Sequence, residues 1–200
     1  MSEIRFVGLD FESDGTDPIN SHIIEVGVIA TGSDLDDVIF TIDSMIRDGD
    51  INDAISTIEN TPVLTEMHGS NGLYADLKKV RDGKKESMTL EDLDRHLYDL
   101  IKTNNTDNHK VILTGSGVGH YDHNVIKAKM PLLASLLMFY PRDIGHTRRE
   151  FNWAVGRDLV DINNHKSHRA FDDITDHINE MKAFRDYFRK AELAIQILGE

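Results

Sequence analysis

The sequence of 200 residues contains no cysteine and only four prolines. The absence of cysteine excludes a disulfide-stapled scaffold, a thiolate zinc site and cysteine-based catalysis. The prolines are scattered, so no proline-rich linker divides the chain, and we expect a single domain spanning residues 1–200. A folded chain of this length buries about 70% of the surface that its unfolded form exposes.

Membrane and secretory features are also missing. No apolar run approaches the roughly 18 residues that a membrane-spanning helix needs, and the first residues do not show the pattern of a signal peptide. We therefore expect a cytoplasmic protein with no membrane partner. Apolar residues make up 40% and charged residues 28% of the sequence, which indicates a folded chain rather than a disordered one.

Positive charge is scarce in the first 60 residues, which hold 2 Lys and Arg against 14 Asp and Glu. The other 140 residues are nearly neutral, with 20 basic against 21 acidic side chains. The net charge of −13 argues against broad non-specific binding to DNA, because phosphates are repelled. It does not exclude a phosphate site bridged by divalent cations, which reverse the local charge.

The order of apolar patterns predicts a mixed α/β protein. The first three strands follow one another closely, which predicts an antiparallel meander. Alternating and β-branched segments predict strands at residues 4–10, 22–30, 38–42, 111–114 and 142–145. Helical periodicity, caps and breakers predict helices at residues 61–68, 73–80, 90–101, 122–130, 132–139 and 168–198.

Two carboxylates, Asp10 and Glu12, stand at the end of the first predicted strand. Side chains two residues apart on an extended segment share a face. They would repel each other unless a cation lay between them, so the pair is a candidate metal site. An ordinary acidic strand end is the alternative interpretation.

Three further segments carry polar residues that could join such a site. Asp122 follows a glycine-rich loop and opens a helix, a position where Asp is common without any ligand. His168 precedes the last helix, whose first turns carry Asp172 and Asp173. The alternative interpretation is that His168 only caps this helix and that the two acids are there because the helix dipole favours negative charge. The segment around His68 is equally consistent with a helix stop followed by a loop.

Taken in order, these segments resemble the DEDDh 3′→5′ exonucleases. Asp10-Phe11-Glu12 matches the first motif of that family, Asp122 the second, and the run from His168 to Asp173 the third. The resemblance selects Asp173 rather than Asp172. It implies a ribonuclease-H-like fold with a mixed five-stranded sheet flanked by helices.

Within that superfamily the chain is most similar to oligoribonuclease, over residues 7–188. The segments that carry this closer resemblance are Ile23–Val26, Met67–Leu73, Met130-Pro131 and His168–Ile174.

The resemblance implies an exonuclease that releases nucleoside monophosphates from the 3′ ends of short RNA or single-stranded DNA. Two ions, Mg²⁺ or Mn²⁺, would be held by Asp10, Glu12, Asp122 and Asp173, since hard cations prefer oxygen ligands. His168 would act as the general base, and the ordinary pKa of a histidine, about 6.5, suits proton transfer at neutral pH. Glu12 would also accept a hydrogen bond from the 3′ hydroxyl.

Substrate contacts follow from the same resemblance. His68 and Leu73 would contact a terminal nucleotide, and Tyr121 or Phe11 could offer a face on which a base stacks. A core position is the alternative for Phe11. Several basic side chains could together contact phosphate groups, although the default interpretation of each one is an ordinary solvated residue. They are Arg142, Arg148, Arg149, Arg157, Lys166 and Arg169.

The sequence departs from the oligoribonuclease pattern at several positions. Asp14 stands where the family has Thr, and Thr16 stands where it has a Leu that wedges against terminal bases. Phe139 takes the place of a Tyr that reaches across a dimer interface, with Tyr140 beside it, and the resemblance makes a homodimer possible. Two alternative functions stay open: a proofreading-type single-stranded DNA exonuclease acting with a replication partner, and a catalytically silent nucleic-acid-binding module.

Overall fold

The computed structural model describes residues 3–161 and 167–198. Within them the chain forms a six-stranded mixed sheet in the order β4-β3-β2-β1-β5-β6. The predicted antiparallel meander is present, because β2 pairs with both β1 and β3. On its other side β1 pairs with β5 in parallel, and β5 pairs with β6. The strands are β1 (Phe6–Ser13), β2 (Ile23–Thr31), β3 (Val38–Arg47), β4 (Met88–Thr89), β5 (Ile112–Gly115) and β6 (Arg142–Asp143).

The sheet differs from the five-stranded prediction by one strand. β4 pairs in parallel with the end of β3, and a strand of two residues is too short to show any periodicity in the sequence. The prediction for residues 142–145 was only half correct. β6 ends at Asp143, and a helix begins at Ile144 because the Asp143 side chain accepts a hydrogen bond from the backbone N–H of Gly145.

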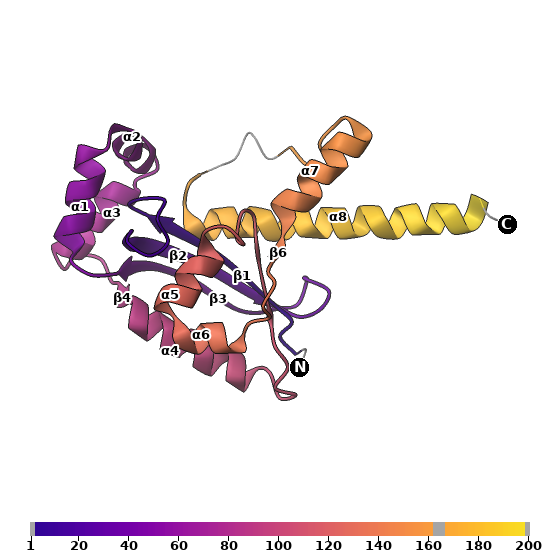
Figure 1. The fold of residues 1–200 in the computed structure, drawn as a ribbon, viewed down its shortest axis with the longest axis horizontal. Helices are drawn as coiled ribbons and strands as arrows, with labels where there is room; N and C mark the ends of the chain where they lie inside the picture. Colours follow the sequence, from indigo (N-terminus) through magenta and orange to yellow (C-terminus); the bar gives the residue numbers. More distant parts are fainter. Residues whose placement is uncertain (1–2, 162–166, 199–200) are drawn as a thin grey trace.

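Helices cover both faces of this sheet (Figure 1). α4, α5 and α6 pack on one face around Leu9 and Val28, and α7 and α8 pack on the other around Phe6 and Ile29. A third, smaller apolar cluster joins α1, α2 and α3 to the ends of β2 and β3. The helices are α1 (Ile51–Asn60), α2 (Pro62–Ser70), α3 (Leu73–Arg81), α4 (Leu90–Thr103), α5 (Asp122–Lys129), α6 (Pro131–Leu136), α7 (Ile144–Val155) and α8 (Ala170–Leu198).

Several helix boundaries are those that the sequence predicts. Pro62 opens α2, and the hydroxyl of Thr89 accepts a hydrogen bond from the backbone N–H of Asp92 at the start of α4. A break separates α2 from α3 as predicted, but α2 continues to Ser70, so only residues 71 and 72 lie between the two helices. α8 begins at Ala170, two residues later than predicted, and α1 and α7 were not predicted.

Figure 1 shows α8 running along the sheet, with its C-terminal half extending beyond it. Although α8 is long, no helix in the described parts of the chain has the length and apolar character needed to cross a lipid bilayer.

Candidate active site

Side chains alternate along β1, and this alternation delivers two carboxylates to one face of the sheet. Leu9 and Phe11 point into the core beneath α4–α6. Gly8 lies on the opposite face, where its lack of a side chain lets α8 approach closely. Asp10 and Glu12 share the face of Gly8, so the strand directs both toward the first turns of α8.

α8 and the residue just before it bring the third motif to these carboxylates. Ligand atoms of Glu12, His168 and Asp173 all lie within 4.8 Å of one another. Asp10 lines one pocket of about 140 Å³ together with His168 and Asp173. The full lining of this pocket consists of Asp10, Ser116, Arg148, His168, Asp173, Asp176 and His177.

The remaining acid of the predicted set, Asp122, approaches the end of β1 from α5. Its Oδ1 accepts a hydrogen bond of 3.1 Å from the backbone N–H of Phe11. Its side chain is buried, and its charge contributes to raising the pKa of Asp10. The structure therefore brings the four predicted metal-binding carboxylates and His168 to one place.

Burial and mutual repulsion dominate the electrostatics of this cluster. Burial raises the pKa of Glu12 to about 8, with Asp173 and Glu25 adding to the effect. Burial also raises the pKa of Asp122 to about 7, against the hydrogen bond from Phe11. The pKa of Asp10 is raised well above its usual range, first by burial and then by the neighbouring acids. The site thus resists the accumulation of negative charge.

The chemistry of these donors fits a hard divalent cation. Carboxylate oxygens are the ligands that Mg²⁺ and Mn²⁺ prefer, and a bound cation would offset the burial and the repulsion that raise the three pKa values. Asp10, Glu12, Asp122 and Asp173 could therefore hold metal ions.

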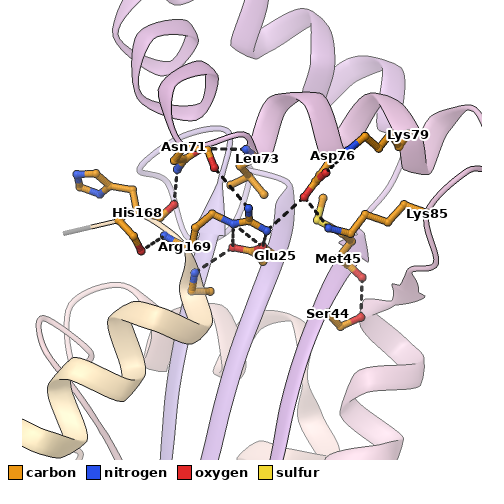
Figure 2. A network of polar contacts seen from close by, with 12 residues as sticks. Glu25, Ser44, Met45, Asn71, Leu73, Asp76, Lys79, Lys85, His168 and Arg169 are labelled. Carbon is orange, nitrogen blue, oxygen red and sulfur yellow. Dashed lines mark hydrogen bonds and ion pairs between the residues drawn. The ribbon is translucent and has the colours of Figure 1, made fainter. Parts of the chain in front are cut away.

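Residues that the sequence analysis did not assign to the site also shape it. Glu25 lies in the wholly buried strand β2 and binds Arg169 and the backbone at the start of α8. Asn71, between α2 and α3, donates a hydrogen bond from its side-chain amide to the carbonyl oxygen of His168, as Figure 2 shows. A carboxylate within an otherwise apolar strand is a signal that could have identified Glu25. Asn71 offers no such signal.

The predicted substrate contacts are distributed unevenly. His68 is fully buried, with Nε2 3.1 Å from the carbonyl oxygen of Ser13. Tyr121 is half-buried at the edge of the core under α4–α6. Phe11 and Leu73 lie in the apolar core, so Phe11 takes the alternative position considered for it and neither side chain lines the pocket.

The predicted basic residues do not gather into one patch. Arg148 lines the pocket and pairs with the buried carboxylate of Glu180, and Arg169 pairs with Glu25. Two others lie over aromatic rings, Arg142 above Phe6 and Arg157 above Phe151. Arg149 is exposed on α7, and Lys166 lies outside the described residues.

The positions that depart from the oligoribonuclease pattern differ in their exposure to solvent. Asp14 is buried and lies 2.7 Å from Nδ1 of His22, whereas Thr16 is exposed. Phe139 is 84% exposed and contacts Tyr140 edge-on. A role of either ring in a dimer stays a prediction.

Comparison with known proteins agrees with the motifs. No protein-family model matches the chain. It is 29% identical over 193 residues to an oligoribonuclease of Marinobacter nauticus, covering 93% of this chain and 97% of the relative. An oligoribonuclease of Neisseria meningitidis serogroup B is 26% identical, with 90% of each chain covered. A probable oligoribonuclease of Schizosaccharomyces pombe is 24% identical, covering 94% of this chain and 71% of the relative.

Solved structures share the fold. Exonuclease I of E. coli in complex with a 5cy-dT13 oligonucleotide superposes with a TM-score of 0.64 at 13% identity. The match covers 93% of this chain but only 41% of exonuclease I. The zinc-bound form of an E. coli exonuclease I complex with single-stranded DNA gives a TM-score of 0.58 at 14% identity, covering 94% and 41%. The chain is thus similar over most of its length to curated oligoribonucleases, and it shares its fold with exonuclease I.

Proposed function

We propose that this protein is a divalent-metal-dependent 3′→5′ exonuclease that releases nucleoside monophosphates from short RNA or single-stranded DNA. The observation that carries the proposal is the convergence of Glu12, His168 and Asp173 within 4.8 Å, in a pocket that Asp10 also lines. Similarity to oligoribonucleases over most of the chain supports the reaction and the short substrate.

In the proposed site, Asp10, Glu12, Asp122 and Asp173 would hold two ions, Mg²⁺ or Mn²⁺. When bound, these ions supply positive charge that stabilises the attacking and leaving oxygens of the phosphodiester. Asp10 lies close enough to the other three acids for their charges to raise its pKa, so all four carboxylates would share in holding the ions.

His168 acts as the general base and takes a proton from the attacking water. The water oxygen forms a bond to the terminal phosphorus while the bond from phosphorus to the 3′ oxygen breaks. The leaving 3′ oxygen takes a proton from solvent, and a nucleoside 5′-monophosphate is released. Glu12 accepts a hydrogen bond from the terminal 3′ hydroxyl, which directs the enzyme to that end of the strand.

A test uses the purified chain, stripped with EDTA and returned to Mg²⁺ or Mn²⁺, on labelled RNA and DNA oligomers of 2 to 10 nucleotides. We expect stepwise release of mononucleotides from the 3′ end only when metal is present. Asp10→Ala and His168→Ala should each lower kcat by about 10²- to 10⁴-fold while retaining the wild-type circular dichroism spectrum. Full activity of either variant would overturn the mechanism.

The role of His168 needs a separate measurement, because its ring nitrogen lies near enough to Glu12 and Asp173 to act as a ligand. Calorimetric titration of Mn²⁺ separates the two roles. A general base leaves the Mn²⁺ affinity of His168→Ala close to that of wild type. A ligand lowers that affinity along with kcat.

A single-stranded DNA exonuclease remains the second candidate, since the structural neighbours include exonuclease I bound to DNA oligonucleotides. The same series of oligomers, extended to 30 nucleotides, separates the candidates. Preference for RNA oligomers of 2 to 5 nucleotides supports an oligoribonuclease-like activity. Equal digestion of long single-stranded DNA supports the alternative.

A further inference from the structure

His168 holds a backbone conformation that side-chain-bearing residues rarely adopt. Its φ angle is +50°, in the left-handed region where the side chain crowds the backbone. The residue sits two positions before the start of α8, at the edge of the pocket. Contacts from the surrounding structure must therefore select this conformation.

One such contact comes from the turn between α2 and α3. The side-chain amide of Asn71 donates to the carbonyl oxygen of His168, and Asn71 Oδ1 accepts a 2.9 Å hydrogen bond from the backbone N–H of Leu73 (Figure 2). The first bond fixes the main chain of His168. The second fixes the Asn71 side chain itself, because it ties that side chain to the first turn of α3.

A second set of contacts fixes the start of α8. Nη2 and Nε of Arg169 donate to Glu25 Oε1 at 2.6 and 2.9 Å, and Glu25 Oε2 accepts from the backbone N–H of Ala170 at 2.9 Å. Glu25 is 2% exposed within β2, so the carboxylate that binds Arg169 and Ala170 is itself held in place by the sheet. Arg169 also reaches the carbonyl oxygen of Asn71 at 3.4 Å and Asp76 at 3.4 Å.

These contacts fix the backbone of His168 in two places. The next residue, Arg169, is bound to Glu25 in the sheet, and the carbonyl oxygen of His168 is bound to Asn71 in the α2–α3 turn. The imidazole ring takes part in none of these bonds, so they orient the residue without using the nitrogen atoms that the reaction needs.

We propose that Asn71 is a positioning residue that holds His168 in its catalytic orientation, with the Glu25–Arg169 pair fixing the helix start beside it. The inference rests on the proposed role of His168 as general base. It assigns to the α1–α3 region a function in the reaction, although no residue of that region lines the described pocket.

The discriminating variant is Asn71→Asp. It has the same shape and still accepts the hydrogen bond from Leu73, but it has no N–H to donate to His168. We expect kcat to fall about 10- to 100-fold with KM changed less than about threefold, because a small displacement of a reacting group lowers the rate without weakening binding. The matched control is Asn104→Asp. It removes a hydrogen bond of the same kind, from the Asn104 side-chain amide to the carbonyl oxygen of Leu100 at the end of α4. This variant should keep kcat within twofold of wild type.

Two readouts distinguish positioning from a general loss of structure. In a His168→Ala background, Asn71→Asp should cause no further loss of kcat, because the group through which it acts is gone. The second readout is the NMR resonance of a carbon-bound proton on the His168 imidazole in the metal-free protein, which is assigned by its absence from the spectrum of His168→Ala. This resonance should be sharp in the wild type and broadened or shifted in Asn71→Asp. Additive losses of kcat, or an unchanged resonance, would overturn the proposal.

A measurement on the wild type covers the case in which Asn71→Asp does not fold. The Asn71 side-chain amide protons should exchange with solvent more slowly than those of Asn179, which is exposed on α8, and unprotected exchange would contradict the hydrogen bond. Failure of the proposed function looks different: His168→Ala would then be fully active. An inactive His168→Ala combined with a fully active Asn71→Asp removes only the positioning role.

Discussion

At the scale of single residues, the site is a place where burial and charge oppose each other. Asp10, Glu12 and Asp122 are carboxyl groups whose charged form is disfavoured by burial, and each is near further acids. A protein stabilises such a group by protonating it or by supplying a cation. The competition between protons and metal ions therefore becomes measurable as stability.

We expect the metal-free protein to lose stability as the pH rises from about 5 to about 8. The pKa of Glu12 rises from 4.5 to about 8 on folding, and that of Asp122 from 3.8 to about 7, both chiefly through burial. Between the unfolded and folded values the native state binds more protons than the unfolded state, so the free energy of unfolding falls as pH rises. The loss should amount to a few kcal/mol, on the order given by such shifts.

Urea denaturation in EDTA at pH 5, 6, 7 and 8 measures this loss. Glu12→Gln, which cannot ionise, should flatten the profile. Adding Mg²⁺ should stabilise the wild type most at pH 8, where the fewest protons have to be displaced. A wild-type stability in EDTA that increases through this window would contradict the prediction.

Adjacent acids on α8 allow a second prediction with an internal control. Asp173 lines the pocket, whereas Asp172 is exposed on the first turn. Asp173→Asn should lower the Mn²⁺ affinity and reduce kcat by about 10²-fold or more, and Asp172→Asn should leave both within about twofold. Calorimetric titration and the oligomer assay report the two effects, and equal losses in both variants would remove the assignment of Asp173.

At the scale of elements, the site depends on how closely α8 lies against the sheet. Gly27 of β2 lies against the first residue of α8, since a Cβ atom there would lie 2.4 Å from the carbonyl oxygen of Ala170. The contact is with backbone, which cannot move aside without shifting the first turn of α8. A glycine is required because no other residue allows this contact.

Gly27→Ala should therefore displace the start of α8, costing about 1–3 kcal/mol in the free energy of unfolding and most of the activity. Gly69→Ala is the control, because nothing lies within 4 Å of its Cβ position and Gly69 is in helix α2. That change should be neutral or stabilising by up to about 1 kcal/mol. Thermal denaturation and the oligomer assay compare them, and a fully active Gly27→Ala would show that the close approach is dispensable.

The elements also show how far the sequence alone could lead. α4 was predicted because its information is local: Thr89 caps it and apolar residues recur at helical spacing. α7 was missed because residues 142–145 were assigned to a strand, so Asp143 was not recognised as the residue that caps the helix. α1 was missed although Asp50 caps it and Ala54, Ile55 and Ile58 form its buried face.

The candidate site divides in the same way. The gathering of Asp10, Glu12 and Asp173 was predicted from the resemblance of the motifs, in their order, to the DEDDh exonucleases, and the spacing within each motif alone left other interpretations open. Contacts such as the one between Glu25 and Ala170 join residues 145 positions apart, and no local pattern announces them. The burial of Leu73 in the core of α1–α3 likewise depends on tertiary packing.

At the scale of the whole molecule, the charge distribution sets which strands can approach. The acidic excess lies in the first 60 residues, which form β1–β3 and α1, and the overall charge of −13 repels polyanions. Two divalent ions in the site would reverse the sign only locally. Short strands that enter one pocket therefore suit this molecule better than long duplexes that need an extended basic surface.

This charge predicts a weak dependence of the reaction on salt. At fixed saturating Mg²⁺, kcat/KM for a short oligomer should change less than about threefold between 50 and 200 mM NaCl, since few Lys or Arg contacts to phosphate are available to be screened. A protein with an extended phosphate-binding surface loses about 10³-fold or more over that range. A steep fall measured here would reveal such a surface.

The position of β1 at the middle of the sheet has a consequence for biosynthesis. Along the chain, β1 (Phe6–Ser13) precedes its partners β5 (Ile112–Gly115) and α8 (Ala170–Leu198), so it is synthesised before them. A nascent chain that already displays Asp10 and Glu12 lacks the strand and the helix that bury them, and so cannot form the pocket that they line with α8. The pocket can therefore assemble only after α8 has been synthesised.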